Sequence, residues 1–400
     1  MVIKQPNILK LIGRDRELFI EDVSNHESEL RKIVAHSRFL IIGGAGSIGQ
    51  VITKELFKRK PKKLHVIDIS ENNLVELVRD IRSSLGYING DFQTYPLDSG
   101  SVEYDAFIES DGEYDYVINL AALKHVRNEK DPFTTMRMLS LNVLNTAKTL
   151  RQSIDKDAIK YFCASTDKAN APVNIYGASK LIMEMFLINN SNQINISTAR
   201  FANVAFSNGS LLDSFNQRIQ KRQPIAAPDD VNRYFITPQE CAELSLMSCI
   251  FGKNLDIFFP KHSEIFNPVT FSEILVRYLE EIGYEPYICR SEEEARELTD
   301  TLLEKGKWPC LLTKSDTTGE KETEDFHSDN QAVNLDRFIN IGVIKNETIY
   351  DLDKTEHFAR KITGMKNNRK WTKKEILELI TELIPDFSHI EKEKYLYDKM

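Results

Sequence analysis

A glycine-rich turn between an apolar run and a helical pattern constrains the fold of this chain more than any other feature. Residues 39–42 are apolar, residues 43–49 read GGAGSIG, and a helical pattern follows through Phe57. In a strand, glycine turn and helix of this kind, the glycines let the backbone approach a pyrophosphate and the helix N-terminus supplies N–H groups. The residues predicted to contact a dinucleotide here are Gly43, Gly46, Ser47, Ile48 and Gly49.

The next apolar run indicates which dinucleotide the chain binds. Residues 64–69 read as a strand, and Asp68 follows Gly49 by nineteen residues. An acidic side chain at this place is expected to bind the adenosine ribose hydroxyls, and its charge would repel the 2′-phosphate of NADP. We therefore expect NAD as the cofactor and favour it over NADP.

Helical and strand patterns continue to alternate after this run. Residues 72–84 and 136–150 read as helices, and residues 94–97, 116–120 and 161–164 read as strands. Such alternation predicts an α/β fold with a right-handed, doubly wound parallel sheet of the Rossmann type. Ligands of such sheets bind at the carboxyl ends of the strands.

The later parts of the chain predict additional units around this sheet. We expect a helical extension at 1–36, a nucleotide-binding domain at 37–200 with its core continuing to about 260, a smaller α/β substrate-binding lobe at 201–345 and a helical extension at 346–400. Charged residues dominate 291–307, which reads as a solvated helix, and 313–326, which reads as a surface loop.

The predicted ends of the third and fourth strands carry further candidates for the cofactor side. Asp98 could contact the adenine or could equally cap a helix. Ala121 and Ala122 are small, so the chain can pass close to a cofactor there. Lys124 could reach the diphosphate or the nicotinamide side. His125 is a candidate substrate contact, although a lone histidine is more often structural.

The stretch 165–180, STDKANAPVNIYGASK, brings together an acid, a base and a phenol. Tyr176 and Lys180 are four residues apart at a predicted helix start, so their side chains should share one face. A nearby ammonium group favours the phenolate of a tyrosine whose ordinary pKa is about 10. Asp167 and Lys168 follow the predicted strand at 161–164, so a parallel sheet would deliver them to the same edge. A bare YxxxK pattern would favour the alternative of a solvated turn and helix without a chemical role.

Polar residues on and after a sixth predicted strand are candidates for the substrate side. Arg200, Asn203 and Ser207 lie on this strand or just beyond it, and Arg233 lies in a proline-rich segment. Loops over a sheet commonly hold substrate groups, and arginine binds phosphate through two parallel hydrogen bonds. The alternative role for such an arginine is a surface ion pair.

Composition excludes several other classes. The chain has 400 residues, 41% apolar and 28% charged, with a formal net charge of −8, so nothing attracts it generally to nucleic acid or anionic membranes. Its five cysteines lack metal-ligand spacing, so neither a disulfide framework nor a metal site is predicted. No apolar run approaches the length of a membrane span or a signal peptide. We expect a cytoplasmic protein that forms a homo-oligomer.

Taken together, the motifs resemble the extended short-chain dehydrogenase/reductases, and within them the polysaccharide-biosynthesis branch that contains the UDP-N-acetylglucosamine 4,6-dehydratases. The motifs that carry the resemblance are GGAGSIG at 43–49, NLAALKHV at 119–126, STDKANAPVNIYGASK at 165–180, RFANVAFSNGS at 200–210, RYFITPQE at 233–240 and GEKETE at 319–324. The glycine motif is typical of the whole superfamily, whereas STDKA followed by YxxxK is specific to this branch.

The resemblance implies an internal redox cycle on a UDP-sugar such as UDP-N-acetylglucosamine. In such enzymes a hydride leaves C4, water is eliminated across C5 and C6, and the hydride returns to C6. Tyr176 would take the C4 hydroxyl proton with help from Lys180, and Thr166 would form a hydrogen bond near C4. Lys168 would remove the C5 proton, and Asp167 would protonate the departing C6 hydroxyl.

The resemblance also implies substrate contacts and leaves alternatives open. Arg200, Asn203, Ser207 and Arg233 would lie on the substrate side, and Glu320 would close the site. Some relatives that retain configuration have methionine where Tyr176 stands, so the C5 stereochemistry stays open. A C4 epimerase would need the tyrosine, the lysine and the cofactor but not the Asp-Lys pair. A non-catalytic dinucleotide-binding protein is the third reading.

Overall fold

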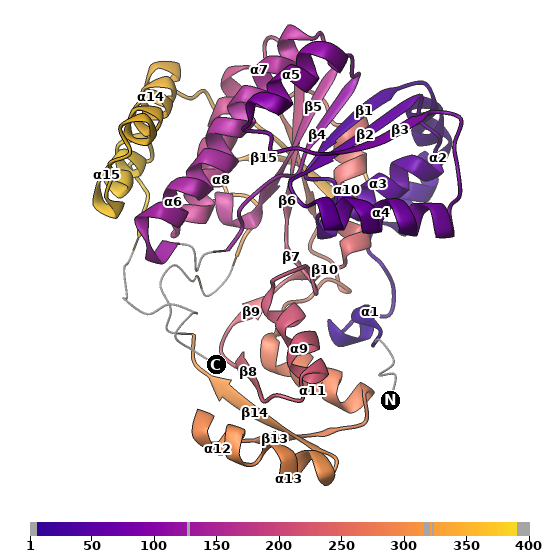
Figure 1. Cartoon of the computed structure of the whole chain (residues 1–400), viewed down its shortest axis with the longest axis vertical. Helices are drawn as coiled ribbons and strands as arrows, with labels where there is room; N and C mark the ends of the chain where they lie inside the picture. The colour runs from indigo at the N-terminus through magenta and orange to yellow at the C-terminus, as the bar shows by residue number, and fades with distance from the viewer. Residues whose placement is uncertain (1–5, 126–128, 316–320, 322–323, 390–400) are drawn as a thin grey trace.

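A nine-stranded sheet forms the centre of the larger domain in the computed structural model, which describes residues 6–125, 129–315, 321 and 324–389 (Figure 1). The strand order is β15-β16-β11-β6-β5-β4-β1-β2-β3. β1 to β6 and β11 are parallel to their neighbours, whereas β16 runs antiparallel to β11 and β15 antiparallel to β16. The bounds are β1 (Arg38–Ile42), β2 (Lys63–Asp68), β3 (Asp91–Pro96), β4 (Tyr116–Asn119), β5 (Lys160–Thr166), β6 (Asn195–Phe201), β11 (Asp256–Pro260), β15 (Ala332–Asn334) and β16 (Ile341–Lys345).

Alternating side chains of the central strands bury both faces of this sheet. Phe39 and Ile41 pack into one core, and Leu40 and Ile42 pack into the core on the other face. This follows from the period of two residues in a strand. The first face is covered by α2 (Ile20–Ala35), α3 (Ser47–Lys58), α4 (Glu71–Ser84) and α10 (Pro238–Phe251). The second is covered by α5 (Val102–Asp111), α7 (Thr146–Asp155) and α8 (Ile175–Asn189). The predicted doubly wound Rossmann sheet is therefore confirmed.

A π-helical turn interrupts the helix that the pattern at 136–150 predicts. α6 (Pro132–Leu139) continues through the π turn η2 (Ser140–Asn145) into α7 without a loop. Such turns often occur at functional sites because they redirect one side chain. Asn142 lies in this turn, and its side-chain amide accepts a hydrogen bond from Leu123 N at 2.9 Å and donates one to Ser179 Oγ at 2.9 Å. The loop after β4 is thereby tied to α8.

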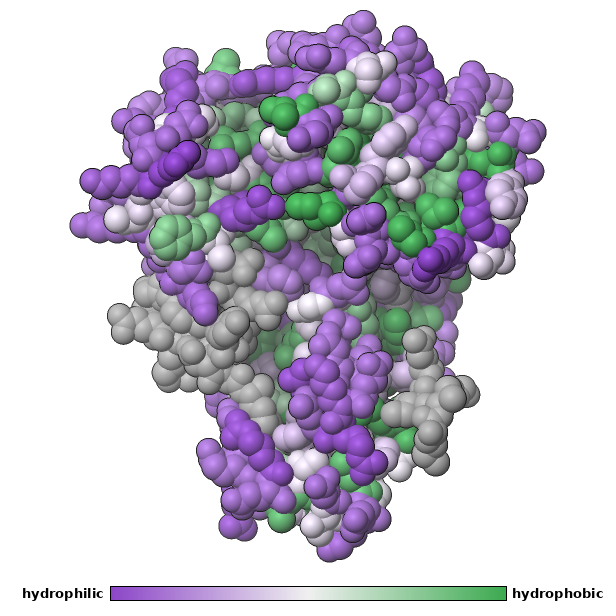
Figure 2. Space-filling view, in the orientation of Figure 1, coloured by the Kyte–Doolittle hydropathy of each residue, from purple (hydrophilic) through white to green (hydrophobic). Residues whose placement is uncertain are grey.

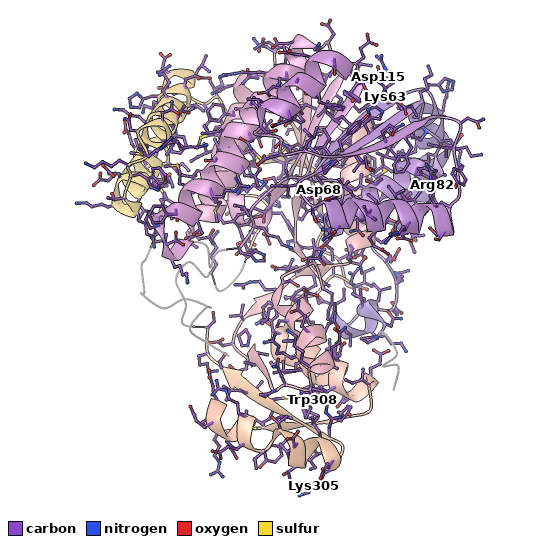
Figure 3. All side chains as sticks on the ribbon, in the orientation of Figure 1. Lys63, Asp68, Arg82, Asp115, Lys305 and Trp308 are labelled. Atoms are coloured by element: carbon purple, nitrogen blue, oxygen red, sulfur yellow. The ribbon has the colours of Figure 1, made fainter. Side chains whose placement is uncertain are left out.

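A smaller lobe lies below the carboxyl edge of the sheet in Figure 1. Its sheet has the order β13-β14-β8, and Trp308, labelled in Figure 3, lies in its core and donates a hydrogen bond to Gln223 O at 2.9 Å. The lobe contains α1 (Ile8–Leu11), β8 (Ile225–Pro228), α9 (Leu211–Gln220), α11 (Phe271–Glu281), β13 (Glu285–Ile288), α12 (Glu292–Glu297), α13 (Thr299–Glu304) and β14 (Lys307–Thr313). Two short strand pairs lie between it and the main sheet: β7 (Asn203–Val204) with β10 (Phe235–Ile236), and β9 (Asn232–Arg233) with β12 (Val269–Thr270).

Two helices near the C-terminus form a third layer outside the main domain. α14 (Leu352–Asn368) and α15 (Lys373–Leu383) form a hairpin beside α6 and α8, at the left of Figure 1. Phe358, Ile376 and Ile380 of the hairpin share a buried core with Ile182 and Phe186 of α8. The hairpin covers an apolar face of α8 that would otherwise contact solvent.

The structure differs from the sequence-based expectation in two charged segments. The segment 291–307 is not one solvated helix but the two short helices α12 and α13, and Leu302 and Leu303 are buried because they pack into the lobe. In the segment 313–326, expected as a surface loop, Glu324 and Phe326 are buried, and the Phe326 ring stacks on that of Phe259 at 5.8 Å. The many charged residues of these two segments predicted exposure to solvent, but tertiary contacts bury a few of their side chains.

The course of the chain also divides the segment expected as one substrate lobe at 201–345. Residues 256–260, 332–334 and 341–345 belong to the main sheet as β11, β15 and β16, so the smaller lobe takes α9 and β8 from before β11 and α11 to β14 from after it. The face shown in Figure 2 is mostly hydrophilic, and its apolar side chains form small separate patches. Within the described residues, no helix is long and apolar enough to cross a membrane.

Candidate active site

The glycine turn after β1 packs closely against the loop after β4. Gly43 has φ +78°, and a Cβ there would lie 2.8 Å from Ala121 N. A Cβ on Gly49 would collide with the carbonyl oxygen of Gly43, so glycine is required at both positions. α3 begins at Ser47 with Gly46 as its N-cap, and no side chain of the described residues caps its first turn. Its N–H groups are therefore available to an anion.

Asp68 lies at the carboxyl end of β2, on the side of the sheet that faces the smaller lobe. Figure 3 shows it there, whereas Lys63 at the start of the same strand and Asp115 before β4 lie at the opposite edge. Asp68 Oδ2 accepts a hydrogen bond from Ala45 N at 3.0 Å, and Oδ1 accepts one from Ser70 N at 2.9 Å. The carboxylate is thereby held beside the glycine turn, where the sequence predicted a ribose contact. The turn, the uncapped helix start and this carboxylate together fit a dinucleotide.

Residues predicted on the cofactor side and on the substrate side meet across the edge of the sheet. Lys124 Nζ donates a hydrogen bond to Ser207 Oγ at 2.9 Å, and burial lowers the pKa of Lys124. Ser47 Oγ accepts a hydrogen bond from Asn208 N at 2.8 Å. His125 lies against Gly209, since a Cβ on that glycine would be 3.0 Å from His125 Nε2. The loop after β7 thus closes over the glycine turn.

Asp98 does not cap a helix. Its Oδ1 accepts a hydrogen bond from Gly100 N at 2.8 Å, and Arg137 lies 3.7 Å from its Oδ2. Ser101, three residues later, caps α5 by accepting from Tyr104 N. Of the two alternatives for Asp98, the adenine contact stays a prediction.

Thr166, Asp167 and Lys168 form one hydrogen-bonded cluster at the carboxyl end of β5, where the short helix η3 (Asp167–Ala169) begins. Asp167 Oδ1 accepts hydrogen bonds from Thr166 Oγ1 at 2.8 Å, from Lys168 N at 2.8 Å and from Lys168 Nζ at 3.0 Å. Asp167 and Lys168, which the sequence predicted as an acid and a base, are therefore in direct contact. A proton can pass between them without an intervening water.

A second carboxylate, Glu324, enters this cluster from a distant part of the chain. Its Oε1 lies 3.6 Å from Lys168 Nζ, and its side chain is 5% exposed. Burial alone would lower the pKa of Lys168, but Asp167 and Glu324 reverse this effect and raise it. Burial and the charge of Asp167 raise the pKa of Glu324 despite the opposing effect of Lys168.

Glu324 is the site residue that sequence reasoning missed. The only signal for it was the GEKETE motif at 319–324, in which Glu320 was the residue predicted to close the site. Glu320 lies outside the described residues. The segment around Glu324 is held by Asn170, whose main-chain oxygen accepts a hydrogen bond from Lys321 Nζ at 2.8 Å and whose Oδ1 accepts one from Ser328 Oγ at 2.7 Å.

Tyr176 lies in the first turn of α8, and its side chain reaches the same cluster. Burial raises the pKa of Tyr176 to about 12; the Lys168 ammonium and a hydrogen bond with Thr166 act in the opposite direction. The expected partner of the phenol, Lys180, instead donates a hydrogen bond to Ala164 O at 2.9 Å, and burial lowers the pKa of Lys180. The cation that favours the phenolate in this structure is therefore Lys168, because Lys180 points to the strand end.

The predicted substrate residues divide into two groups. Arg200 is enclosed, with Nη2 2.7 Å from Glu184 Oε2 and Nη1 donating to Phe326 O at 2.8 Å. Its place on the substrate side stays a prediction, and buried protein acceptors already surround the guanidinium. Arg233 is also buried and donates to Lys321 O at 2.7 Å, but its charge acts on both Lys168 and Glu324. Asn203 lies on β7, where its Nδ2 donates to Tyr234 O at 3.4 Å.

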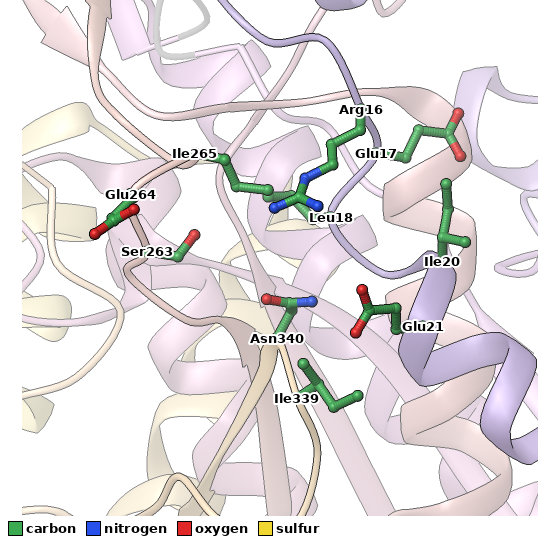
Figure 4. Close-up of a pocket in the computed structure, with 10 residues that line it drawn as sticks. All are labelled: Arg16, Glu17, Leu18, Ile20, Glu21, Ser263, Glu264, Ile265, Ile339 and Asn340. Carbon is green, nitrogen blue, oxygen red and sulfur yellow. The ribbon is translucent and has the colours of Figure 1, made fainter.

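A separate pocket of 390 Å³ lies where the start of α2 meets the segments 263–265 and 339–340 (Figure 4). Arg16, Glu17 and Glu21 line it from one side, and Ile339 and Asn340 from the other. None of the predicted catalytic, cofactor or substrate residues belongs to its lining. We assign it no part in this site.

Comparison with known proteins shows the fold and the family of this chain. The solved structure of Pen from Bacillus thuringiensis superposes with a TM-score of 0.63 over 78% of this chain and 88% of that chain, at 23% identity. The chain thus shares with Pen the doubly wound α/β fold of the extended short-chain dehydrogenase/reductases. The sequence model of the polysaccharide biosynthesis protein family matches residues 39–302, and the chain belongs to this family. The resemblance drawn from the motifs is confirmed.

Relatives in this family differ in length and in their printed activities. An uncharacterised membrane protein of Methanocaldococcus jannaschii is 30% identical over 66% of this chain and 77% of its own length. The chain spans only 42% of the capsular polysaccharide biosynthesis protein CapD of Staphylococcus aureus, at 26% identity. An inverting UDP-N-acetylglucosamine 4,6-dehydratase of Campylobacter jejuni is 28% identical over 56% of this chain and 66% of its own. A UDP-glucose 4-epimerase of Rickettsia prowazekii is 26% identical over 61% and 70%.

Proposed function

We propose that this chain is a 4,6-dehydratase that converts UDP-N-acetylglucosamine to a UDP-2-acetamido-2,6-dideoxy-4-hexulose for polysaccharide biosynthesis. The observation that carries the proposal is the contact between Asp167 and Lys168 beside Tyr176. A C4 epimerase needs a phenol at this edge of the sheet but has no use for a neighbouring acid and base. The likeness to the Campylobacter jejuni dehydratase supports the proposal.

In the oxidation half of the reaction, Tyr176 and its neighbours act on the C4 hydroxyl group. Bound NAD would accept the C4 hydride and return it to C6 within one turnover; the residues that would hold NAD are the glycine turn, Asp68 and Lys180. Tyr176 takes the C4 hydroxyl proton. It must do so as the phenolate, which the Lys168 ammonium and the Thr166 hydroxyl stabilise against the burial that raises the phenol pKa to about 12, and the transfer leaves Tyr176 as the neutral phenol. Thr166 is thereby placed to contact the same oxygen.

The elimination half requires a proton shift between Lys168 and Asp167. As the ion pair, Lys168 is an ammonium and cannot remove a proton. Transfer of one proton across the 3.0 Å hydrogen bond gives a neutral amine and a neutral carboxylic acid. The amine then removes the C5 proton, and the acid protonates the departing C6 hydroxyl, so water leaves and both charges are restored. After hydride return to C6, the Lys168 ammonium would give a proton to C5, and the proton on Tyr176 would restore the starting charges of the phenol and the lysine. Glu324 disfavours this shift before substrate binds, because its charge stabilises the ammonium.

The epimerase alternative is supported by the relationship to the Rickettsia prowazekii enzyme. NMR of the product from UDP-N-acetylglucosamine in deuterium oxide separates the two activities. The dehydratase gives a C6 methyl signal and deuterium at C5, whereas the epimerase gives UDP-N-acetylgalactosamine without a methyl signal. A product of the second kind would overturn the proposal.

Two variants test the assigned roles, with a matched control. Lys168→Ala should keep cofactor binding and lose formation of the C6 methyl group, and Tyr176→Phe should lose turnover altogether. Lys148→Ala removes a lysine of α7 whose partner is Asp105 and should leave the rate unchanged. An unchanged rate in Lys168→Ala would remove that lysine from the mechanism, and an active Tyr176→Phe would support a non-catalytic role for the phenol.

A further inference from the structure

A buried carboxylate holds the first turn of the helix that carries Tyr176. Glu129 is fully buried, and its Oε1 accepts a hydrogen bond from Tyr176 N at 2.9 Å. Asn174 Oδ1 accepts from the next amide, Gly177 N, at 2.7 Å. The first N–H groups of a helix have no partner within the helix, and a negative charge there is stabilised by the helix dipole. Glu129 therefore fixes the backbone of the predicted catalytic tyrosine.

The other oxygen of this carboxylate faces a histidine that follows the C-terminal hairpin. His389 Nε2 lies 3.4 Å from Glu129 Oε2, and the two side chains are 6% and 1% exposed. Phe387, two residues earlier, is buried in the core between the hairpin and α8, and its ring lies 5.9 Å from that of His389. When the imidazole carries a proton, this contact compensates the charge of the buried carboxylate.

A second contact fastens the hairpin to the segment that follows Glu129. Trp371, in the turn between α14 and α15, donates a hydrogen bond from Nε1 to Pro132 O at 2.9 Å, and its ring lies 6.0 Å from that of Phe133. The hairpin thus holds the segment 129–133 at two points, one at its turn and one after its last helix. Figure 1 shows the hairpin lying along α6 and α8.

We propose that His389 and Glu129 form a latch by which the C-terminal hairpin positions Tyr176. The inference rests on the proposed function for the role of the phenol, and on the geometry alone for the link between hairpin and helix. A fully buried carboxylate that loses its partner must gain a proton, take up water or turn away, and each change weakens its hydrogen bond to Tyr176 N. The first turn of α8 then loosens, and the phenol leaves its place beside Thr166. Glu129 and His389 are positioning residues, since neither reaches the reacting atoms.

Four variants of the full chain test the latch. Glu129→Ala removes the acceptor for Tyr176 N, and His389→Ala removes only the outer partner. Glu129→Gln keeps an acceptor without charge, and His389→Gln keeps a donor. The control is His357→Ala on α14, a histidine of the same hairpin outside this contact.

Two readouts separate the latch from a general loss of stability. Hydrogen exchange followed by mass spectrometry reports the amides of residues 174–181 without any need for activity. We expect about fivefold to tenfold faster exchange there in Glu129→Ala and in His389→Ala, and wild-type exchange in His389→Gln and in the control. In turnover of UDP-N-acetylglucosamine we expect kcat to fall about 10-fold to 100-fold with KM nearly unchanged, because a displaced catalytic group affects the chemical step.

The outcomes distinguish failure of the latch from failure of the proposed function. Unchanged exchange at 174–181 in both alanine variants overturns the latch, whatever the activity. If exchange is faster in the alanine variants but the wild-type protein forms no C6 methyl product, the link between the hairpin and α8 stands and the dehydratase assignment is overturned. Faster exchange over the whole of α8, with a matching fall in melting temperature, would show that the contact stabilises the fold and does not position the phenol. Rescue by His389→Gln but not by His389→Ala supports the latch directly.

Discussion

Replacing Glu324 with glutamine should lower the pKa of Lys168 and move the pH dependence of elimination to lower pH. Glu324 Oε1 lies 3.6 Å from Lys168 Nζ, and the Glu324 side chain is nearly enclosed. Lys168 acts as a base only after its proton has passed to Asp167, so elimination needs one proton on this pair and its rate falls as pH rises through the pKa of Lys168. Removing a negative charge next to an ammonium destabilises the charged form, which lowers that pKa.

The size of the shift follows from Coulomb's law. Two unit charges at this distance interact with about 4.6 kcal/mol at an effective dielectric constant of about 20. The Lys168 side chain keeps 18% exposure, and the amide introduced by Glu324→Gln would retain a dipole, so water and the amide reduce the effect. We expect the pKa of Lys168 to fall, which favours the shift of its proton to Asp167 and makes elimination at pH 7 about tenfold faster.

The assay is the single-turnover rate of C6 methyl formation, followed by NMR over a range of pH. Asp325→Asn is the matched control, because it removes the adjacent charge without changing a contact of Lys168. If the midpoint of the pH–rate profile stays in place or rises in Glu324→Gln, the electrostatic reasoning is refuted. Loss of elimination with intact folding and cofactor binding would instead make Glu324 the proton donor in place of Asp167.

Three further predictions concern stability and cofactor binding. Glu184→Gln leaves the Arg200 guanidinium buried without its partner and should lower the free energy of unfolding in urea by about 3–5 kcal/mol. Gly49→Ala should weaken NAD binding in a fluorescence titration because its Cβ meets the Gly43 carbonyl, whereas Gly364→Ala, with open space around it, should not. Burial raises the pKa of Glu243 to about 7, so folding stability should fall as pH rises from about 4.5 to 7, by on the order of 3 kcal/mol. Urea titrations at pH 5 and pH 8 should show this loss in the wild type and not in Glu243→Gln.

Local sequence determined the elements around the glycine turn. The run of apolar residues, the glycine turn and the following helical pattern predicted β1, its turn and α3, because these signals act over a few residues. The strand at 161–164 and the pattern YxxxK placed Asp167, Lys168 and Tyr176 at one edge of the sheet, because parallel strands bring their carboxyl ends together. Asp68 was found by its distance along the chain from the glycine turn.

Such local patterns could not predict contacts between segments that are distant in the sequence. Glu324 meets Lys168 and Glu129 meets His389 only after the chain has folded, and both glutamates lie in charged segments of ordinary composition. Spacing of four residues suggested that Lys180 would act on Tyr176, but the rotamer that the core permits directs its ammonium to Ala164 O. The sequence likewise predicted Arg200 on the substrate side, whereas in the structure its guanidinium is buried in an ion pair with Glu184.

The sequence by itself therefore determined the class of fold, the glycine turn and the meeting of Asp167, Lys168 and Tyr176 at one edge of the sheet. Only the tertiary structure decided their electrostatic partners: which carboxylate holds Lys168 charged, which cation acts on Tyr176 and which part of the chain fixes the start of α8. The physical reason is that backbone patterns extend over a few neighbours in sequence. Charge–charge interactions and burial depend on distance in space, which folding alone sets.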